Sequence, residues 1–234
     1  MKILAIDSSS TPASIAVTDG EMPIGEFTIN INRTHSEKLL PLMDSLLDAI
    51  NLKASDIDVF AVSVGPGSFT GLRIGMSAAK LMAQTLGKPL IGVKTLEALA
   101  ENVCAFDGFI APVIDARNNT FYTALYECSD GELREIYGAE ALETEVLCER
   151  LCNMTGRVLV CGEYIKYCSK ISELTSLSGN VRFAPVHISY QRAVSCAVLA
   201  YKQYMRGDVT MPEAVTPLYV RDSQAEQARK AKKQ

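Results

Sequence analysis

The strongest constraint on the fold is a pattern that occurs twice, with its two copies 108 residues apart. In each copy an aspartate, Asp7 or Asp115, ends an apolar run, a polar turn follows, and a second strand-like run returns. Strand and helix signals then follow both copies in a similar order. Two structural repeats indicate a duplicated chain with one lobe built from each copy. The sequence therefore predicts an α/β fold of two lobes with mixed sheets flanked by helices.

The predicted elements alternate between strands, read from short apolar or alternating runs, and helices, read from apolar residues at three- and four-residue spacing. In the first half we expect strands at 2–7, 13–18, 24–31, 59–64 and 90–93, and helices at 36–50, 69–86 and 95–104. The first of these helices has Thr34 or Ser36 as its N-cap. In the second half we expect strands at 132–137 and 158–161, and helices at 143–152 and 191–205.

These elements suggest how the chain is divided. We expect residues 1–104 to form the first lobe, completed by a returning C-terminal segment near 190–221, and residues 105–189 to form a second, smaller lobe. Residues 222–234 are expected to form a flexible, polar, basic tail.

Composition excludes several classes of protein. No run approaches the roughly 18 apolar residues of a membrane span, and no secretory leader is recognised, so we expect a cytoplasmic protein without membrane contact. The net charge is -4, whereas a protein that holds nucleic acid by itself usually has a strongly basic domain. Seven cysteines without a CxxC pair are expected to be reduced, and Cys148 with Cys152 cannot complete a tetrahedral metal site.

The most distinctive segment is Gly65 to Gly75, at a predicted strand-to-helix turn. Glycine permits positive φ and close backbone approach, and the amides at the helix start could bind an anion. Gly71 and Gly75, however, lie inside the predicted helix, where each costs about 1 kcal/mol relative to alanine. Close packing against this helix is therefore the favoured interpretation, and anion binding is the alternative.

Two helices carry wide apolar faces. The apolar arc of the helix at 36–50 spans about 160°, and apolar or small residues cover most of the helix at 69–86. Either the second helix is central in its own lobe, or an uncovered face of the two helices binds a partner. We predict the partner interface at Leu39, Met43, Leu46, Leu47, Gly71, Leu72, Gly75, Met76, Ala79 and Ala83.

Three stretches carry a family resemblance: Thr34 to Pro41, Val64 to Gly75 and Lys88 to Val93. They resemble the bacterial TsaB (YeaZ) family, strongly over the first predicted lobe and weakly after it, and are also similar to TsaD, the catalytic paralogue of TsaB. The resemblance implies an actin-like (ASKHA, ribonuclease H-like) fold. It also implies a non-catalytic scaffold or activator of TsaD, which forms threonylcarbamoyladenosine next to the anticodon of tRNAs that read codons starting with A.

The resemblance implies partners as well. TsaB is expected to form a heterodimer with TsaD through the two helices named above, to join the TsaE ATPase in a larger complex, and to form a homodimer when alone. It is expected to meet tRNA only through the complex.

One departure from TsaD decides the expected chemistry. The segment of TsaD similar to Ile91 to Leu99 carries HxxxH, two histidines that bind the catalytic metal. This sequence has Thr95 and Leu99 at those positions, and only Glu97 between them remains. The two histidines of the chain, His35 and His187, do not form a local pair. We therefore assign no catalytic, metal-binding or cofactor-binding residue.

The alternative function is an actin-fold kinase or ATPase that binds ATP. Asp7 and Asp115 occupy places where such enzymes hold metal or phosphate. The loop after Asp7, however, lacks a glycine or lysine to hold phosphate, and Val160 to Glu163 contains a single glycine. Aspartates that cap turns are the favoured interpretation, and saturable ATP binding would support the alternative. A metallopeptidase would need the absent histidine pair.

Overall fold

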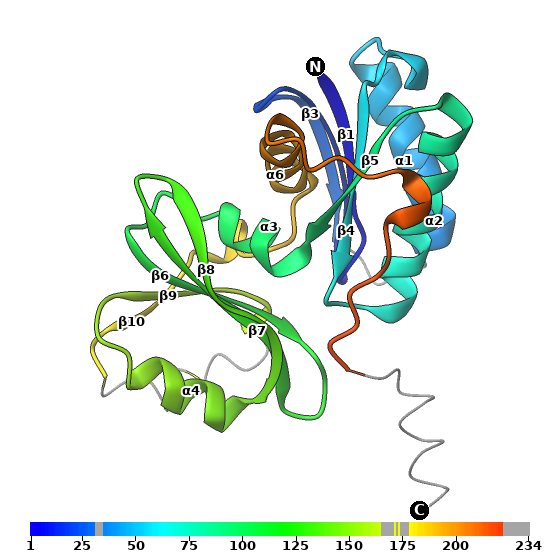
Figure 1. The fold of residues 1–234 in the computed structure, drawn as a ribbon. Coiled ribbons are helices and arrows are strands. Elements are labelled where there is room, and N and C mark those ends of the chain that lie inside the picture. The colour runs from blue at the N-terminus through cyan, green and yellow to red at the C-terminus, as the bar shows by residue number, and fades with distance from the viewer. Residues whose placement is uncertain (31–34, 165–170, 172, 174–177, 222–234) are drawn as a thin grey trace, which may run out of the picture.

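The fold consists of two five-stranded mixed sheets, one in each lobe, with helices packed on them (Figure 1). It is described from a computed structural model, for residues 1–30, 35–164, 171, 173 and 178–221. Within this part of the chain no helix is long and apolar enough to cross a membrane.

The first sheet has the strand order β3-β2-β1-β4-β5, in which β1 to β3 are antiparallel and β4 and β5 run parallel to β1. The strands are β1 (Lys2–Asp7), β2 (Ala13–Asp19), β3 (Met22–Ile29), β4 (Val59–Gly65) and β5 (Leu90–Lys94). α1 (His35–Ala49) and α2 (Phe69–Leu86) cover one face, and α6 (Ala193–Met205) covers the other. The 3-10 helix η1 (Ala54–Asp56) precedes β4.

The second sheet repeats this topology, with the order β10-β9-β6-β7-β8. β6 to β8 form the antiparallel meander, and β9 and β10 run parallel to β6. The strands are β6 (Gly108–Asp115), β7 (Thr120–Ser129), β8 (Glu132–Glu143), β9 (Val158–Gly162) and β10 (Val181–Phe183). α4 (Thr144–Cys152) packs on one face, and α3 (Thr95–Glu101) packs on the other. The predicted duplication and the two-lobed fold class are confirmed.

Most predicted elements are present with small shifts at their ends. α2 has the predicted bounds, whereas α3 ends three residues early, at Glu101. β8 extends six residues beyond the predicted end, to Glu143, because its pairing with β7 continues past the Gly138-Ala139 step that weakens the strand signal. Of the two predicted N-caps of α1, Thr34 lies outside the described residues, and Ser36 lies inside the helix.

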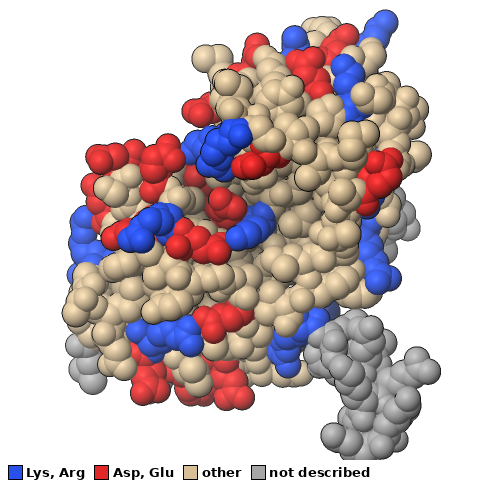
Figure 2. All heavy atoms as spheres, viewed as in Figure 1, with Lys and Arg blue, Asp and Glu red and all other residues tan. Residues whose placement is uncertain are grey.

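Charged side chains gather where the second sheet meets the first lobe (Figure 2). Lys94, at the end of β5, pairs with Glu135 of β8 at 2.7 Å. Lys202 of α6 pairs with Glu101 of α3 at 3.0 Å. Such partly exposed pairs contribute about 0 to 1 kcal/mol each, so they orient the lobes more than they stabilise them.

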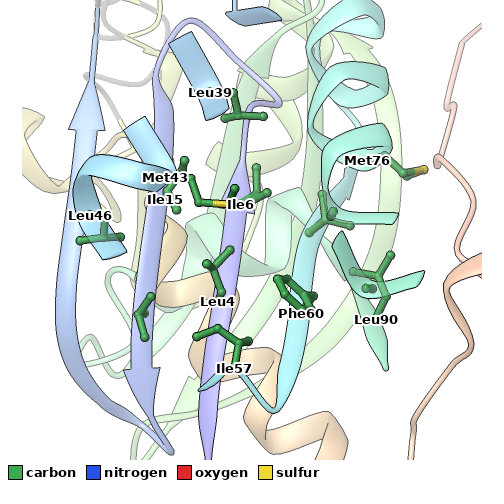
Figure 3. Close-up of a cluster of buried hydrophobic side chains, with 14 of the residues drawn as sticks. Leu4, Ile6, Ile15, Leu39, Met43, Leu46, Ile57, Phe60, Met76 and Leu90 are labelled. Atoms are coloured by element: carbon green, nitrogen blue, oxygen red, sulfur yellow. The ribbon is translucent and has the colours of Figure 1, made fainter. Parts of the chain in front are cut away.

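The main core lies between the first sheet and its two outer helices (Figure 3). β1 and β2 contribute alternate apolar residues to this face, and α1 and α2 each turn an apolar stripe toward it. The side chains labelled in Figure 3 are all buried: Leu4, Ile6, Ile15, Leu39, Met43, Leu46, Ile57, Phe60, Met76 and Leu90.

After α6 the chain returns across the first lobe as an extended segment, residues 207–221, which we call the C-terminal strap. It contains the 3-10 helix η4 (Pro212–Ala214). Thr210 bonds to Leu90 at the edge of the first sheet, and the Leu218 amide donates to the Val64 carbonyl at 2.7 Å. Val215 is buried in the main core. The strap therefore covers the free edge of β5 and one side of α2.

Candidate functional site

The ten residues predicted as a partner interface lie inside the chain's own core, and the prediction is wrong as stated. Gly71 and Gly75 are buried, and none of the eight larger side chains is more than 5% exposed. The reason is that the first sheet needs an apolar cover, and the stripes of α1 and α2 supply it. The ten residues that lie in the core, and not at a free surface, are Leu39, Met43, Leu46, Leu47, Gly71, Leu72, Gly75, Met76, Ala79 and Ala83.

The small residues of α2 let the helix lie directly on the loop after β1. A Cβ atom on Gly71 would lie 2.0 Å from the Ser8 carbonyl oxygen, and one on Gly75 would lie 2.2 Å from the Ser8 hydroxyl. The Ser8 hydroxyl donates to the Gly71 carbonyl at 2.9 Å. The prediction of close packing is confirmed.

The backbone amides at the start of α2 donate hydrogen bonds to other groups of the same chain. The Ser68 amide donates to the Ser9 carbonyl at 2.6 Å, and the Gly71 amide donates to the Ser68 hydroxyl at 3.2 Å. Ser68 is thus the N-cap of α2. These bonds anchor the helix start to the loop after β1.

The polar side of α2 contacts the C-terminal strap. Gln84 donates to the Glu213 carboxylate at 2.9 Å, and Lys80 reaches the Glu213 carbonyl at 3.4 Å. Arg73 donates to the Tyr219 hydroxyl at 3.1 Å. The polar sector of this helix therefore meets a segment that lies more than 120 residues later in the chain.

Between the strap side and the core side, α2 leaves a stripe of partly exposed apolar residues, which we call the outer α2 stripe: Ile74, Ala78, Leu81 and Met82. Their spacing of three and four residues places them on one side of the helix. Leu81 is 63% exposed, and the other three are half-buried. On the neighbouring α1, Leu40 is 46% exposed. This is the apolar surface that the two helices leave to solvent.

Each strand-end aspartate bonds to residues of its own lobe. One Asp7 oxygen accepts from the Ser9 amide at 2.9 Å and the Ser9 hydroxyl at 2.6 Å, and the other accepts from Ser63 at 2.6 Å. Asp115 accepts from the Arg117 amide at 2.8 Å. Both aspartates cap turns, as predicted.

Glu163, just after β9, joins the two lobes. One oxygen of its carboxylate accepts from the Ser10 hydroxyl of the first lobe. The other accepts from the Asp115 amide of the second lobe at 2.8 Å. The Glu163 carboxylate therefore links the two repeats directly.

Comparison with known proteins decides the family. The family model of TsaD, described as tRNA N6-adenosine threonylcarbamoyltransferase, matches residues 25–229. The chain is 28% identical over 231 residues to the Escherichia coli tRNA threonylcarbamoyladenosine biosynthesis protein TsaB, with 96% of both chains covered. The chain belongs to the TsaB (YeaZ) branch of the TsaD family. The TsaB of Bacillus subtilis is 39% identical over 136 residues, and the match spans 59% of that protein, less than two thirds of it.

Solved structures agree with this assignment to the TsaB branch. YeaZ from Pseudomonas aeruginosa superposes with a TM-score of 0.74 at 25% identity, covering 93% of this chain and 99% of that one. A ROK hexokinase from Thermus thermophilus superposes with a TM-score of 0.50 at 11% identity, covering 88% of this chain and 100% of that one. The second likeness is one of fold alone, and it places the two lobes among actin-like and sugar-kinase folds.

The two positions where TsaD carries its histidine pair have structural contacts in this TsaB-branch chain. The Thr95 hydroxyl accepts from the Gly65 amide at 3.1 Å, which fixes the turn before α2. Leu99 is fully buried against the second sheet, next to Gly162. Leu99 thus joins the lobes, whereas Thr95 holds a turn within the first lobe. His187 is exposed in η3 (Val186–Ile188), and the side chain of His35 lies outside the described part.

Glu97, the acidic residue between these positions, is partly buried at the junction of the lobes. Burial raises its pKa above 4.5, and the nearby Glu135 carboxylate adds to this, while Lys94 opposes it. Ionisation of Glu97 therefore disfavours the folded state. The free energy of unfolding should fall as the pH rises above about 4.5 toward the raised pKa.

Glu97→Gln is expected to remove the free-energy cost of holding an ionised carboxylate at this partly buried position. The variant should unfold with a larger free energy than wild type at pH 7, and the difference should vanish at a pH below the ordinary carboxyl range. Urea denaturation at pH 3 and pH 7 measures both values. The exposed Glu149→Gln on α4 is the control and should change stability by less than about 0.5 kcal/mol. A Glu97→Gln gain that is equal at both pH values would contradict the burial argument.

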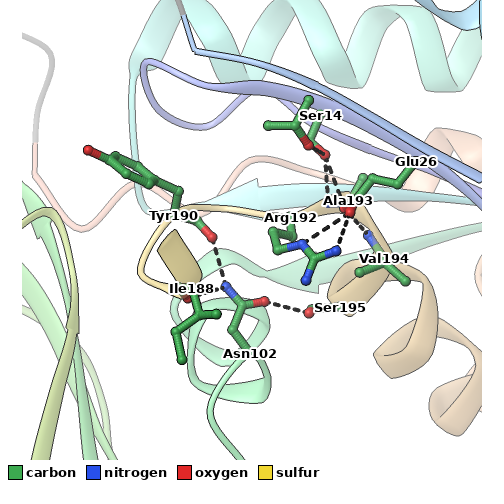
Figure 4. Close-up of polar contacts among 10 residues, drawn as sticks. Ser14, Glu26, Asn102, Ile188, Tyr190, Arg192, Ala193, Val194 and Ser195 are labelled. Atoms are coloured by element: carbon green, nitrogen blue, oxygen red, sulfur yellow. Dashed lines mark hydrogen bonds and ion pairs between the residues drawn. The ribbon is translucent and has the colours of Figure 1, made fainter. Parts of the chain in front are cut away.

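A polar network that the sequence did not predict anchors α6 (Figure 4). Ser14 of β2 accepts from the Ala193 amide at 3.0 Å, and Glu26 of β3 accepts from the Val194 amide at 3.2 Å and pairs with Arg192. On the other side Asn102 bonds to Ser195 at 2.6 Å. Side chains from two strands thus cap a helix start that lies 179 and 168 residues later in the chain, which local capping rules cannot detect.

Proposed function

We propose that this chain is a non-catalytic scaffold or activator of TsaD in the biosynthesis of threonylcarbamoyladenosine in tRNA. The observation that carries the proposal is the role of the side chains that stand at the two positions where TsaD has histidines. Thr95 bonds to the Gly65 amide and Leu99 fills the junction of the lobes, so these side chains serve the fold. Catalysis would then belong to TsaD, which transfers the threonylcarbamoyl group to the adenosine beside the anticodon.

The proposed assembly is a heterodimer with TsaD, joined by the TsaE ATPase in a larger complex, with tRNA met only in that complex. In the absence of TsaD we expect a homodimer with two-fold symmetry. We place the protein in the cytoplasm, where tRNA is modified. The TsaB names of the relatives support this assignment.

We propose the outer α2 stripe, with Leu40 beside it, as the surface that meets TsaD. Leu81 is the most exposed large apolar residue on the two outer helices, and Ile74 and Ala78 extend the same stripe. Apolar side chains that a folded chain leaves exposed are available to an interface core. The surface differs from the predicted set, because it uses partly exposed residues that flank the buried side of the same helices.

The test is the Leu81→Arg variant. A charge placed in the apolar centre of the contact should weaken association with TsaD at least tenfold, which corresponds to about 1.4 kcal/mol. Calorimetric titration with purified TsaD measures the affinity, and modification of tRNA by the reconstituted set reports function. Val146→Arg on α4 also adds an arginine at an exposed apolar position, 45% exposed, and should bind TsaD as wild type does. Wild-type affinity of Leu81→Arg would refute the surface.

The kinase or ATPase alternative is not favoured. Both oxygens of Asp7 accept hydrogen bonds from serines, and the Glu163 carboxylate of the second lobe accepts from Ser10, in the loop that follows Asp7. The glycines of α2 pack the loop after β1 tightly. Saturable ATP binding to the isolated chain would revive this alternative.

A further inference from the structure

A cavity of about 280 Å³ lies beside the start of α6. One side of it comes from β3 and the residue that follows this strand, and another comes from the segment that runs from η3 into α6. The lining residues include Glu26, Thr28, Asn30, Tyr190, Gln191 and Arg192. Pockets for drug-sized ligands usually enclose about 300 to 1,000 Å³, so an occupant of this cavity must be small.

The two charged side chains of the cavity wall neutralise each other (Figure 4). Nε of Arg192 donates to one Glu26 carboxylate oxygen at 3.0 Å, and the other oxygen accepts from the Val194 amide at 3.2 Å. An ionic ligand would have to break this pair to gain a counter-charge, and a charge left without its partner is costly away from water. The cavity therefore favours an uncharged ligand.

The carboxamide of Gln191 is the group in this wall that most needs a partner. Gln191 is 1% exposed, and neither its side-chain nitrogen nor its side-chain oxygen has a hydrogen-bond partner in the described part of the chain. Buried polar atoms are nearly always hydrogen-bonded in folded proteins, because an unpaired one is unfavourable. Since Gln191 also lines the cavity, a turn of its side chain would bring the carboxamide to a ligand there.

We infer that this cavity binds a small, uncharged molecule that carries an amide group. An amide presents N–H and carbonyl groups side by side, and this arrangement pairs with both polar atoms of the Gln191 carboxamide. Asn30 and Thr28 add further uncharged donors and acceptors to the wall. The inference goes beyond the proposed function and does not depend on it, because these residues are separate from the outer α2 stripe.

The first experiment titrates the full-length wild-type chain with three probes of nearly the same shape, followed by heteronuclear NMR. Nicotinamide carries the amide, 3-acetylpyridine keeps the carbonyl but lacks the N–H donors, and nicotinate has a carboxylate instead. Nicotinamide should bind with a Kd of about 1 mM and should shift the side-chain amide signals of Gln191. The other two probes should bind at least about tenfold more weakly, because each leaves the Gln191 oxygen without a donor.

The second experiment removes the carboxamide. Gln191→Leu should weaken nicotinamide binding at least about tenfold, and it should melt at or above the wild-type temperature because two unpaired polar atoms leave the interior. Gln84→Leu is the control, since Gln84 is exposed on α2, which covers the opposite face of the first sheet from α6. This variant should bind nicotinamide as wild type does.

Several results would overturn the inference and leave the proposed function standing. These are similar affinities for all three probes, tighter binding of nicotinate than of nicotinamide, and no binding of nicotinamide up to about 10 mM. Wild-type nicotinamide affinity of Gln191→Leu would overturn it as well. A lower melting temperature of Gln191→Leu would show that the carboxamide is bonded inside the protein, which also contradicts the inference. The probe comparison uses the wild-type chain and so does not depend on how any variant folds.

Discussion

Replacing Ala79 with arginine is expected to abolish the native state. Ala79 is 0% exposed in the middle of α2, within the core formed with the first sheet. An arginine there would bring an unpaired charge and a long side chain into a packed interior, at a cost of about 3 to 5 kcal/mol for the charge alone. Overpacking adds about 1 to 3 kcal/mol. Because a domain of this kind is stable by about 5 to 15 kcal/mol, we expect aggregation or a non-cooperative melt followed by circular dichroism.

Leu81→Arg, two residues further along, is the matched control. Its side chain is 63% exposed, so the same arginine should change the free energy of unfolding by less than about 1 kcal/mol. Comparing Ala79→Arg with Leu81→Arg distinguishes the buried side of α2, which stabilises the fold, from its exposed side, which is available for binding. A cooperative Ala79→Arg melt at the wild-type temperature would mean that this side of α2 does not face the core.

The second large effect is expected for Gly71→Ala, although it adds only one methyl group. Its Cβ would lie 2.0 Å from the Ser8 carbonyl oxygen, which belongs to the backbone and cannot rotate away. Either α2 or the loop after β1 must shift, and the bonds of Ser8 and Ser68 shift with it. We expect a loss of about 2 to 4 kcal/mol, outweighing the helix propensity gained, measured as a lower urea midpoint.

Gly138→Ala in β8 provides the comparison. The nearest atom to the added Cβ is a Glu135 carboxylate oxygen at 3.5 Å, at the end of a flexible side chain. This substitution should change stability by less than about 0.5 kcal/mol. Equal urea midpoints for Gly71→Ala and Gly138→Ala would show that the contact between α2 and Ser8 relaxes easily.

The fold was largely predictable because its signals are local. The duplicated aspartate turns, the alternating strands and the apolar period of α2 each depend on fewer than about 20 neighbouring residues. The role of Asp7 was predicted for the same reason, since a strand-end aspartate bonds to the amide two residues later.

The binding surface was not predictable in the same way. A wide apolar arc on α2 shows that the helix is covered, but it does not say by what. In this chain the cover is the first sheet, α1 and the strap, and residues such as Glu213 and Tyr219 come from the far end of the sequence. The contact of Glu163 with Ser10 spans 153 residues and has no local signature.

The return of α6 to the first sheet has a consequence for synthesis on the ribosome. β1 and β2 emerge first, yet the face formed by Ile3, Ala5 and Ala16 is covered by Cys196 and Leu199 of α6. At about 5 to 20 residues per second, about 10 to 40 s pass before that helix is made. A nascent or prematurely terminated chain that lacks α6 would therefore expose this apolar sheet face to chaperones and proteases.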